Sequence, residues 1–241
     1  MAKSKGKDVF CAVRGDSLAE QVHAQLARMI LSGAFAPNDR INLRQIAPDF
    51  SVSVTPVREA VLRLVSDGIL QTTDRNAIVV PQRGADEIRE IFEIRRVLEG
   101  DLAEAAATKL PPADIEALRE TQADFIMALE KKDYREALRL NTELHFRIYT
   151  AAEMPVRVKI VEGLWLRIGP TLRNMYPILT LHRPDSSPHD RILSAASARD
   201  ARGLREAVVA DLNRSEEALL EYLRRAEEAQ PFVSPTQGDG R

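Results

Sequence analysis

Five polar side chains beyond residue 84 interrupt apolar stripes that recur at three- and four-residue spacing. Arg95, for example, falls between Ile91 and Leu98 on one such stripe. The five residues are Arg95, Asn141, His145, His189 and Asp211. Because one neutral polar group buried without a partner costs roughly 2–7 kcal/mol, we expect all five to meet in one internal cavity.

Two imidazoles and two oxygen-bearing side chains among them form a candidate ligand set for a divalent metal. Asn141 and His145 are one helical turn apart, the spacing of metal-ligand pairs on helices. With His189 and Asp211 they would offer two nitrogens and two oxygens, which suits zinc, nickel or manganese. A buried Arg95 calls for an anion, and a carboxylate matches a guanidinium best. Arg95 is therefore the candidate anchor for a small carboxylate effector.

Each of these residues also has a simpler structural explanation. A histidine on an apolar face can be a hydrogen-bonded core residue, and Arg95 could pair with a core carboxylate, for which Asp211 is a candidate. Trp165 and Tyr149 could line a pocket or serve only as packing residues. The alternative to a metal site is a metal-free pocket in which the same groups hydrogen-bond the effector directly.

The composition of the whole chain limits its class. At 241 residues it can hold one large or two small domains. The net charge of −2 gives no overall attraction to nucleic acid, so any DNA-binding charge must be local. The single cysteine, Cys11, allows no intrachain disulfide and fits a reducing compartment. With no long apolar run and no signal-peptide core, we expect a cytoplasmic protein without membrane segments.

Helical periodicity dominates the chain, so we expect a mainly α fold. Residues 17–81 show three helices and a small β-hairpin, the pattern of a winged helix-turn-helix. The predicted hairpin has β-prone runs at 69–72 and 77–80 around the turn-forming Asp74-Arg75-Asn76. Beyond it, we expect an all-α helical bundle with helices at about 85–109, 112–131, 133–152, 155–175, 188–198 and 200–228, and a polar, proline-rich loop near 177–188.

The domain boundaries follow from these elements. We expect a flexible basic tail at 1–16, a DNA-binding domain at 17–81, an all-helical ligand-binding and dimerisation domain at 82–229, and a disordered tail at 230–241.

The third predicted helix, which ends at Gly68, is the candidate recognition helix. Either Ser53 or Thr55 could cap its start, and glycine ends a helix at little conformational cost. Arg58 lies off its apolar stripe and near its amino end, as expected of a helix that enters a DNA groove.

These residues resemble the GntR family of bacterial winged-helix regulators over residues 18 to 81. The motifs are Ser53-Val54-Thr55-Pro56-Val57-Arg58-Glu59-Ala60, then Arg63-Leu64 and Asp67-Gly68-Ile69-Leu70, with Ile30-Leu31-Ser32-Gly33-Ala34-Phe35-Ala36-Pro37 upstream. The resemblance implies DNA contacts by Arg44 and Arg58, whereas Val54 stands where relatives often have an arginine. The DNA-binding residues expected on this basis are Arg44, Ser53, Val54, Thr55, Arg58, Arg75 and Asn76.

Residues 84 to about 225 resemble the FCD effector domain of the FadR-type GntR subfamily. The matching motifs are Glu93-Ile94-Arg95 with Leu98-Glu99, Asn141-x-x-Leu144-His145, and His189-x-x-Ile192-Leu193-x-Ala195. In metal-binding members an aspartate and three histidines hold a divalent ion beside a small carboxylate. His145 and His189 match two of those histidines, whereas Asn141 replaces the aspartate and Asp211 the last histidine. The formal charge of the set is unchanged.

The resulting hypothesis is a ligand-responsive repressor, not an enzyme, that binds a two-half-site operator as a homodimer. One alternative is a helical metal-dependent hydrolase using His145, His189 and Asp211, fused to a DNA-targeting module. The sequence has no nucleophile–base motif, glycine-rich phosphate loop or HExxH signature to favour it. The other alternative is a DNA-binding protein whose helical domain only dimerises.

Overall fold

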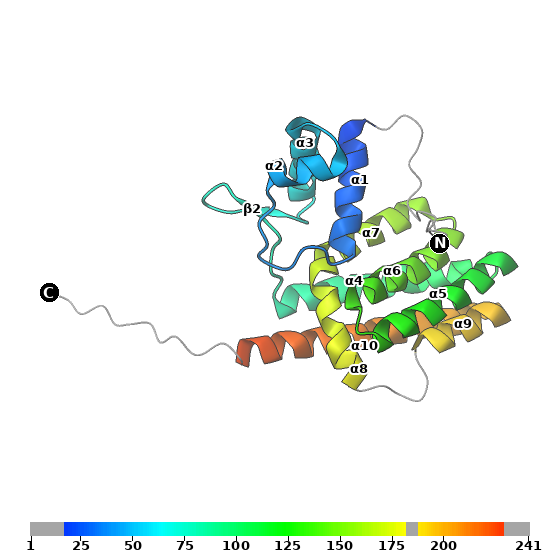
Figure 1. Ribbon diagram of the computed structural model, residues 1–241. Coiled ribbons are helices and arrows are strands. Elements are labelled where there is room, and N and C mark those ends of the chain that lie inside the picture. The colour runs from blue at the N-terminus through cyan, green and yellow to red at the C-terminus, as the bar shows by residue number, and fades with distance from the viewer. Residues whose placement is uncertain (1–16, 182–187, 229–241) are drawn as a thin grey trace.

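The computed structural model describes residues 17–181 and 188–228. The predicted tails at 1–16 and 230–241, and residues 182–187 of the predicted loop at 177–188, lie outside these residues. Figure 1 shows a small N-terminal part above a larger bundle of helices. The predicted fold class, a winged helix-turn-helix followed by an all-helical domain, is confirmed. No helix in the described ranges combines the length and the apolar character needed to cross a membrane.

The small part holds three α-helices joined in the order of a winged helix-turn-helix. Ser17 and Glu20 form a capping box at the start of the first, in which each side chain accepts the other's backbone N–H. Asn42 caps the second helix by accepting from the Arg44 N–H, and Pro48 lies in the 3-10 turn that follows it. The elements are α1 (Leu18–Leu31), α2 (Leu43–Ile46), η1 (Ala47–Phe50) and α3 (Val54–Ser66).

Helix α3 is the predicted recognition helix, and it packs its apolar side against α1. Val57, Val61 and Leu64 are fully buried there. The expectation of a hydroxyl cap is wrong, because Ser53 occupies the N-cap position without a side-chain capping hydrogen bond. Gly68 follows the helix with a φ of +69°, a left-handed conformation that glycine adopts without steric cost.

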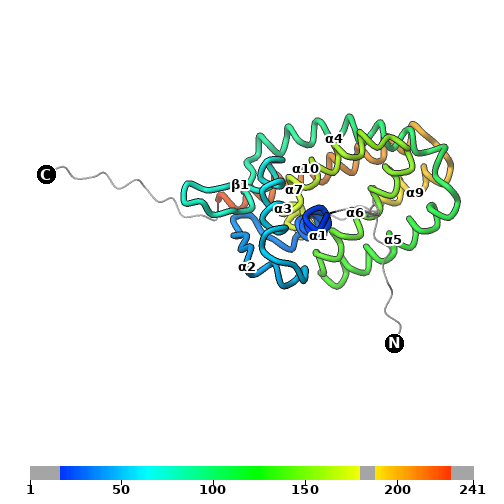
Figure 2. The backbone as a smooth tube through the Cα atoms, turned by 90° about the horizontal axis from the view of Figure 1, so that it is seen from above, coloured from blue at the N-terminus to red at the C-terminus, as the bar shows by residue number. Residues whose placement is uncertain are grey.

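The wing is a short antiparallel hairpin of β1 (Gln71–Thr72) and β2 (Ile78–Val79). Its base is tied to the loop before α2, where the Ile41 N–H donates to the Ile78 carbonyl over 2.9 Å. Asn76 lies in the turn with a φ of +56°, which asparagine tolerates better than most residues. Figure 2 shows the hairpin projecting beyond the helices, so its tip is free to reach a partner.

The larger part is built entirely from helices. α4 and α10 lie side by side, α5 packs on α6, and α9 contacts both α10 and α5. Its helices are α4 (Ala85–Ala106), α5 (Pro112–Glu130), α6 (Tyr134–Ala151), α7 (Pro155–Leu172), α8 (Tyr176–Leu181), α9 (Pro188–Ala198) and α10 (Ala201–Glu228), with a 3-10 turn η2 (Arg173–Met175) between α7 and α8.

The predicted loop near 177–188 is wrong over its first residues, which form helix α8. Its proline content favoured a loop in the sequence. Pro177, however, is the second residue of α8, where a missing backbone N–H costs little because no intrahelical partner exists for it. Helix α8 therefore forms despite the proline.

Helix α7 joins the two parts of the molecule. A Cβ placed on Gly169 would lie 3.1 Å from the Ile30 carbonyl oxygen and 3.3 Å from the Leu31 Cα. The absence of a side chain at Gly169 thus lets α7 approach the backbone at the end of α1. Nearby, Arg173 Nη1 donates to the Gly33 carbonyl over 3.0 Å.

The segment between the wing and α4 makes a second connection through Arg83, which is buried. Its Nε donates to the Arg167 carbonyl on α7 over 2.8 Å, and its Nη2 donates to the Gly68 carbonyl behind the recognition helix. Glu87 pairs with the same guanidinium. Arg167 in turn donates to the Asp67 carbonyl over 2.9 Å. One arginine therefore links the end of α3 to α7 and α4.

Two glycines on α7 offer a matched test of this contact. Gly169→Ala should be less stable than Gly163→Ala by about 1–3 kcal/mol, because a backbone oxygen cannot move aside easily. A Cβ at Gly163 meets no atom within 4 Å, so that variant reports only the gain in helix propensity. The measurement is the free energy of unfolding in urea. Equal stability of the two variants would show that α7 does not need the close approach.

Candidate functional site

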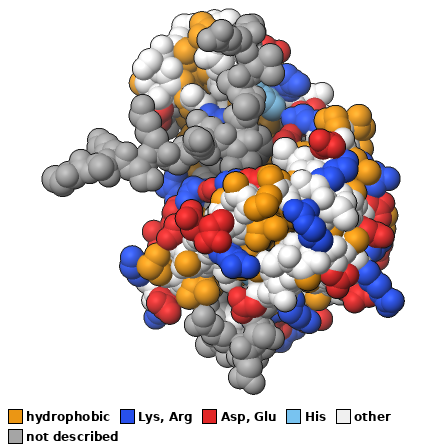
Figure 3. Space-filling view, turned by 90° about the vertical axis from the view of Figure 1, so that its right-hand side faces the viewer, with side chains coloured by type: hydrophobic (Ala, Val, Ile, Leu, Met, Phe, Trp, Pro, Cys, Tyr) orange, Lys and Arg blue, Asp and Glu red, His pale blue; other side chains and the backbone are white. Residues whose placement is uncertain are grey.

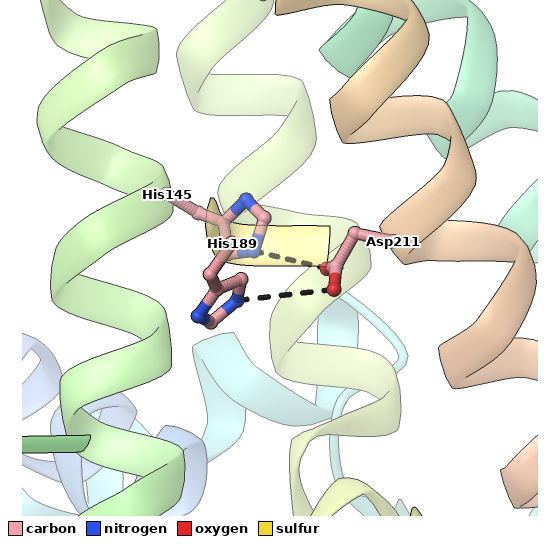
Figure 4. Close-up of side chains that lie close together, drawn as sticks. All are labelled: His145, His189 and Asp211. Atoms are coloured by element: carbon pink, nitrogen blue, oxygen red, sulfur yellow. Dashed lines mark ion pairs between the residues drawn. The ribbon is translucent and has the colours of Figure 1, made fainter. Parts of the chain in front are cut away.

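Three of the predicted ligand residues meet inside the helical domain. His145 comes from α6, His189 from α9 and Asp211 from α10, and one ligand atom from each lies within 4.8 Å of the others. His145 Nε2 is 3.2 Å from Asp211 Oδ2, and His189 Nε2 is 3.8 Å from Asp211 Oδ1. Figure 4 shows both imidazole rings beside the same carboxylate. Both histidines are buried and Asp211 is 14% exposed, so the cluster is internal.

The other two predicted residues are also buried. Asn141 lies one turn before His145 on α6 and is 6% exposed. Arg95 is 2% exposed, as its stripe on α4 predicted. Its guanidinium lies 4.4 Å from the Trp165 ring and 4.8 Å from the Phe92 ring, so it stacks between aromatic faces.

Arg95 already has a carboxylate partner, Glu99, which the sequence reasoning missed. Arg95 Nε donates to Glu99 Oε1 over 2.5 Å and Nη2 to Oε2 over 3.3 Å. The core carboxylate considered as an alternative partner for Arg95 is thus Glu99 rather than Asp211. The signal was present in the sequence, because a residue four positions after a buried arginine lies on the same face of the helix.

Glu99 also accepts two hydrogen bonds from residues first considered as packing or pocket lining. The Tyr149 hydroxyl donates over 2.6 Å and Trp165 Nε1 over 3.0 Å. Burial, together with the Glu99 charge, raises the pKa of Tyr149 well above its ordinary value, so its phenol stays protonated. With no exposed surface of its own, Glu99 is held entirely by these donors.

This chain of hydrogen bonds sets the tautomer of His145. The Tyr149 hydroxyl donates its hydrogen bond to Glu99, so its oxygen accepts from His145 Nδ1, 3.0 Å away. A neutral His145 then carries a lone pair on Nε2. That nitrogen is buried and has no hydrogen-bond partner among the described residues, although it lies 3.2 Å from Asp211 Oδ2. In that form the lone pair of His145 Nε2 faces the Asp211 carboxylate.

His189 is arranged in the same way by Gln122 of α5, a second residue that sequence reasoning missed. Gln122 Oε1 lies 2.7 Å from His189 Nδ1, which leaves Nε2 toward Asp211. Gln122 is 4% exposed. In the sequence it falls on a stripe with Leu118 and Phe125, four residues after one and three before the other, so the rule that found the other five residues would have found it.

The electrostatics of the site favour a neutral His189 and an ionised Asp211. Burial lowers the pKa of His189 to about 4 despite the opposing charge of Asp211, so the ring is neutral near pH 7. Burial also opposes ionisation of Asp211, but His145, His189 and Arg95 outweigh it and hold its pKa below the ordinary value. Nitrogen atoms of His145 and of the neutral His189 thus converge with one ionised carboxylate, an arrangement that favours a cation.

The predicted DNA-binding residues lie on the surface of the small part. Arg44 on α2, Arg58 on α3 and Arg75 in the wing are exposed, and none forms an ion pair within residues 17–181 and 188–228. Ser53, Thr55 and Asn76 are exposed as well, and Val54 is half-buried. By contrast, the face of the helical domain drawn in Figure 3 intermixes basic and acidic side chains. The small part thus presents three exposed arginines without ion pairs, which supply the local positive charge that the net charge of −2 requires.

Comparison with known proteins agrees with this division. The model described as bacterial regulatory proteins, gntR family, matches residues 18–80, and that of the FCD domain matches residues 90–214. The chain belongs to the GntR family. The match to the FCD domain includes all three residues of the cluster, His145, His189 and Asp211.

Its relatives are transcriptional regulators. The chain is 33% identical over 191 residues to the HTH-type transcriptional regulator McbR of Escherichia coli, covering 78% of this chain and 86% of that protein. It is 22% identical over 200 residues to the E. coli HTH-type transcriptional repressor RspR, covering 83% and 88%. The solved structure of E. coli McbR/YncC superposes with a TM-score of 0.78 at 30% identity, covering 86% and 99%. This GntR-family protein is a transcriptional regulator with an FCD domain, and it is not an enzyme.

The Glu99 network makes a prediction for stability. Glu99→Gln keeps the size of the side chain but leaves Arg95 buried without a counter-ion, so we expect the free energy of unfolding in urea to fall by about 3–5 kcal/mol. The control is Glu104→Gln on the same helix, whose carboxylate is 53% exposed and pairs with Arg205. An exposed pair contributes at most about 1 kcal/mol. Equal losses in the two variants would refute the role of Glu99.

Proposed function

We propose that this GntR-family protein is a ligand-responsive repressor that acts in the cytoplasm as a homodimer on a two-half-site DNA operator, with a small carboxylate as effector. The observation that carries the proposal is the convergence of His145, His189 and Asp211 inside the helical domain, away from the exposed DNA-binding residues. A buried ligand site in one domain and a DNA-binding surface in the other are the two parts that a ligand-controlled regulator requires.

The donor set supports a divalent metal as part of the effector site. His145 Nε2 and His189 Nε2 both face Asp211, and neither nitrogen needs to carry a proton. Asn141, one turn from His145, is the candidate for a fourth ligand through its side-chain oxygen. Nitrogen and oxygen ligands of this kind suit zinc, nickel or manganese. When bound, the ion would act as a Lewis acid toward an effector oxygen.

Charge balance supports an anionic effector once the ion is bound. Around the site, the two carboxylates of Glu99 and Asp211 balance the two guanidinium groups of Arg95 and Arg214. Asp190 is exposed and is left out of this balance. A divalent cation would therefore leave a net positive charge, which attracts a carboxylate. Arg95 stays in the proposal as an effector-binding residue, but its bond to Glu99 means that much of the attraction must come from the metal.

For DNA, we propose that α3 enters the major groove. Arg58, together with Arg44, would contact base edges or phosphates, and Val54 could touch a thymine methyl group. Ser53 and Thr55 lie at the same end of the helix with exposed hydroxyl groups that could bind phosphate. The wing would bring Arg75 and Asn76 to the adjacent minor groove.

Helix α7 is the proposed connection between the effector site and the DNA-binding domain. Trp165, which donates to Glu99 at the site, lies one turn before Gly169, which contacts the end of α1. Arg167, between them, donates to the carbonyl of Asp67 at the end of α3. A displacement of Trp165 on ligand binding would therefore move contacts that position the recognition helix, provided the two arrangements differ in ligand affinity.

The metal prediction is tested on protein purified without a histidine tag or chelator. We expect elemental analysis to find about one equivalent of zinc, nickel or manganese, and excess metal at about 100 times Kd to stabilise the fold by about 2.7 kcal/mol. His189→Gln should lose the metal, whereas His23→Gln, outside the site, should keep it. Less than about a tenth of an equivalent, with no stabilisation by added metal, would leave the metal-free pocket.

The DNA prediction concerns Arg58. Arg58→Ala should weaken binding to an operator selected in vitro with the wild type by about 1–3 kcal/mol while helical circular dichroism stays unchanged. Affinity should also fall steeply with salt, because phosphate contacts release counterions. The control is Arg139→Ala on α6, whose guanidinium pairs with Glu136 and Glu143. Wild-type affinity of Arg58→Ala in fluorescence anisotropy would exclude a direct contact.

A further inference from the structure

Gln122 has one end of its amide engaged and the other unpaired inside the domain. Its Oε1 lies 2.7 Å from His189 Nδ1. Its Nε2 is buried and has no hydrogen-bond partner among the residues that the structure describes. An amide N–H shut away from water without an acceptor is costly, so a group that binds here is expected to supply that acceptor.

The engaged end has a consequence for the metal site. If Oε1 accepts, then Nδ1 of His189 carries the ring proton and Nε2 keeps its lone pair on the side of Asp211. Such an outer partner fixes the orientation of a ligating imidazole and increases its basicity. Tyr149 does the same for His145, so the two rings are held by hydrogen bonds to residues of α5 and α6, which pack on each other.

The unpaired end has a consequence for the effector. The ring of Phe125, on the next turn of α5, lies 4.9 Å from the His189 ring, so this part of α5 forms a wall of the site. Gln122 Nε2 and Oε1 are bonded to the same carbon atom, so Nε2 belongs to this part of α5 beside His189. A buried donor without a partner is a means of recognising an oxygen of a ligand while discriminating against ligands that lack one.

We propose that Gln122 acts in two ways, as the positioning residue for His189 and as a hydrogen-bond donor to an oxygen of the bound carboxylate. This inference rests on the proposed effector site and assigns it a residue that determines specificity. The reverse orientation of the amide, with Nε2 donating to Nδ1, would put the ring proton on Nε2 of His189 and block that nitrogen as a ligand.

The first test needs neither metal nor effector. In the metal-free full-length protein, 15N NMR of the histidine rings should show His189 protonated at Nδ1, with the signal assigned by its loss in His189→Gln. Gln122→Glu, which keeps an acceptor, should preserve this tautomer, whereas Gln122→Leu should lose the preference. A proton on Nε2 in the wild type would overturn the positioning role, whether or not the protein binds metal. Should Gln122→Leu fail to fold, Gln122→Met serves in its place.

The second test separates the two roles by binding, with Zn²⁺ and then acetate, malonate or citrate as probes. Gln122→Leu should weaken Zn²⁺ binding about 10- to 100-fold. Gln122→Glu should bind Zn²⁺ at least as tightly as wild type, but its zinc-loaded form should bind the carboxylate about tenfold more weakly, since it lacks the donor. Ala123→Glu, which places the same charge at the exposed neighbouring position, should leave both affinities unchanged.

The outcomes are distinguishable from failure of the proposed function. Unchanged carboxylate binding in Gln122→Glu, or no binding of any of the three carboxylates to the zinc-loaded wild type, would overturn the donor role. Unchanged Zn²⁺ affinity in Gln122→Leu would overturn the positioning role. Failure of the wild type to bind Zn²⁺ would instead overturn the proposed metal site, and the tautomer measurement would still decide what Gln122 does to His189.

Discussion

The buried carboxylate of Glu99 is the constraint on which the rest of the site depends. An ionised group with no exposed surface is stable only when donors surround it, and Glu99 has donors from Arg95, Tyr149 and Trp165. These come from three different helices, α4, α6 and α7, so one charge fixes their relative positions. The same carboxylate accepts the hydrogen bond of the Tyr149 hydroxyl, so the Tyr149 oxygen faces His145 Nδ1 and His145 Nε2 lies toward Asp211. The geometry of the cluster thus follows from an interaction that includes none of the proposed metal ligands.

Helix α7 is placed by requirements at two successive turns of one face. At one turn Trp165 must reach Glu99, and at the next Gly169 must lie against the end of α1. A packed interior shifts between discrete arrangements more readily than it deforms continuously. A change at Trp165 is therefore expected to be transmitted along the helix rather than absorbed. Arg83 adds to this connection, because it binds carbonyls at the end of α3 and on α7 at once.

The two halves of the molecule use charge in different ways. Inside the helical domain the pair of Arg95 and Glu99 is buried and balanced, and it orients the side chains around it. In the small domain Arg44, Arg58 and Arg75 are exposed, without partners in the described part of the chain, and are available to an external polyanion. This explains how a chain with a net charge of −2 can belong to a family of DNA-associated regulators.

The sequence alone determined the fold class, because winged-helix and helical patterns depend on local periodicity, caps and turns. It also identified His145, His189 and Asp211, since polar residues on apolar stripes must find partners. The spacing of Arg95 and Glu99 on one helix also carried the signal for their pairing. Only the tertiary structure decided that Tyr149 and Trp165 donate to Glu99 and that Gln122 lies against His189. Periodicity can mark such residues as buried, but it describes the face of one helix at a time. Which buried group meets which depends on how α4, α5, α6, α9 and α10 pack together, and that packing is set by contacts between residues far apart in the chain.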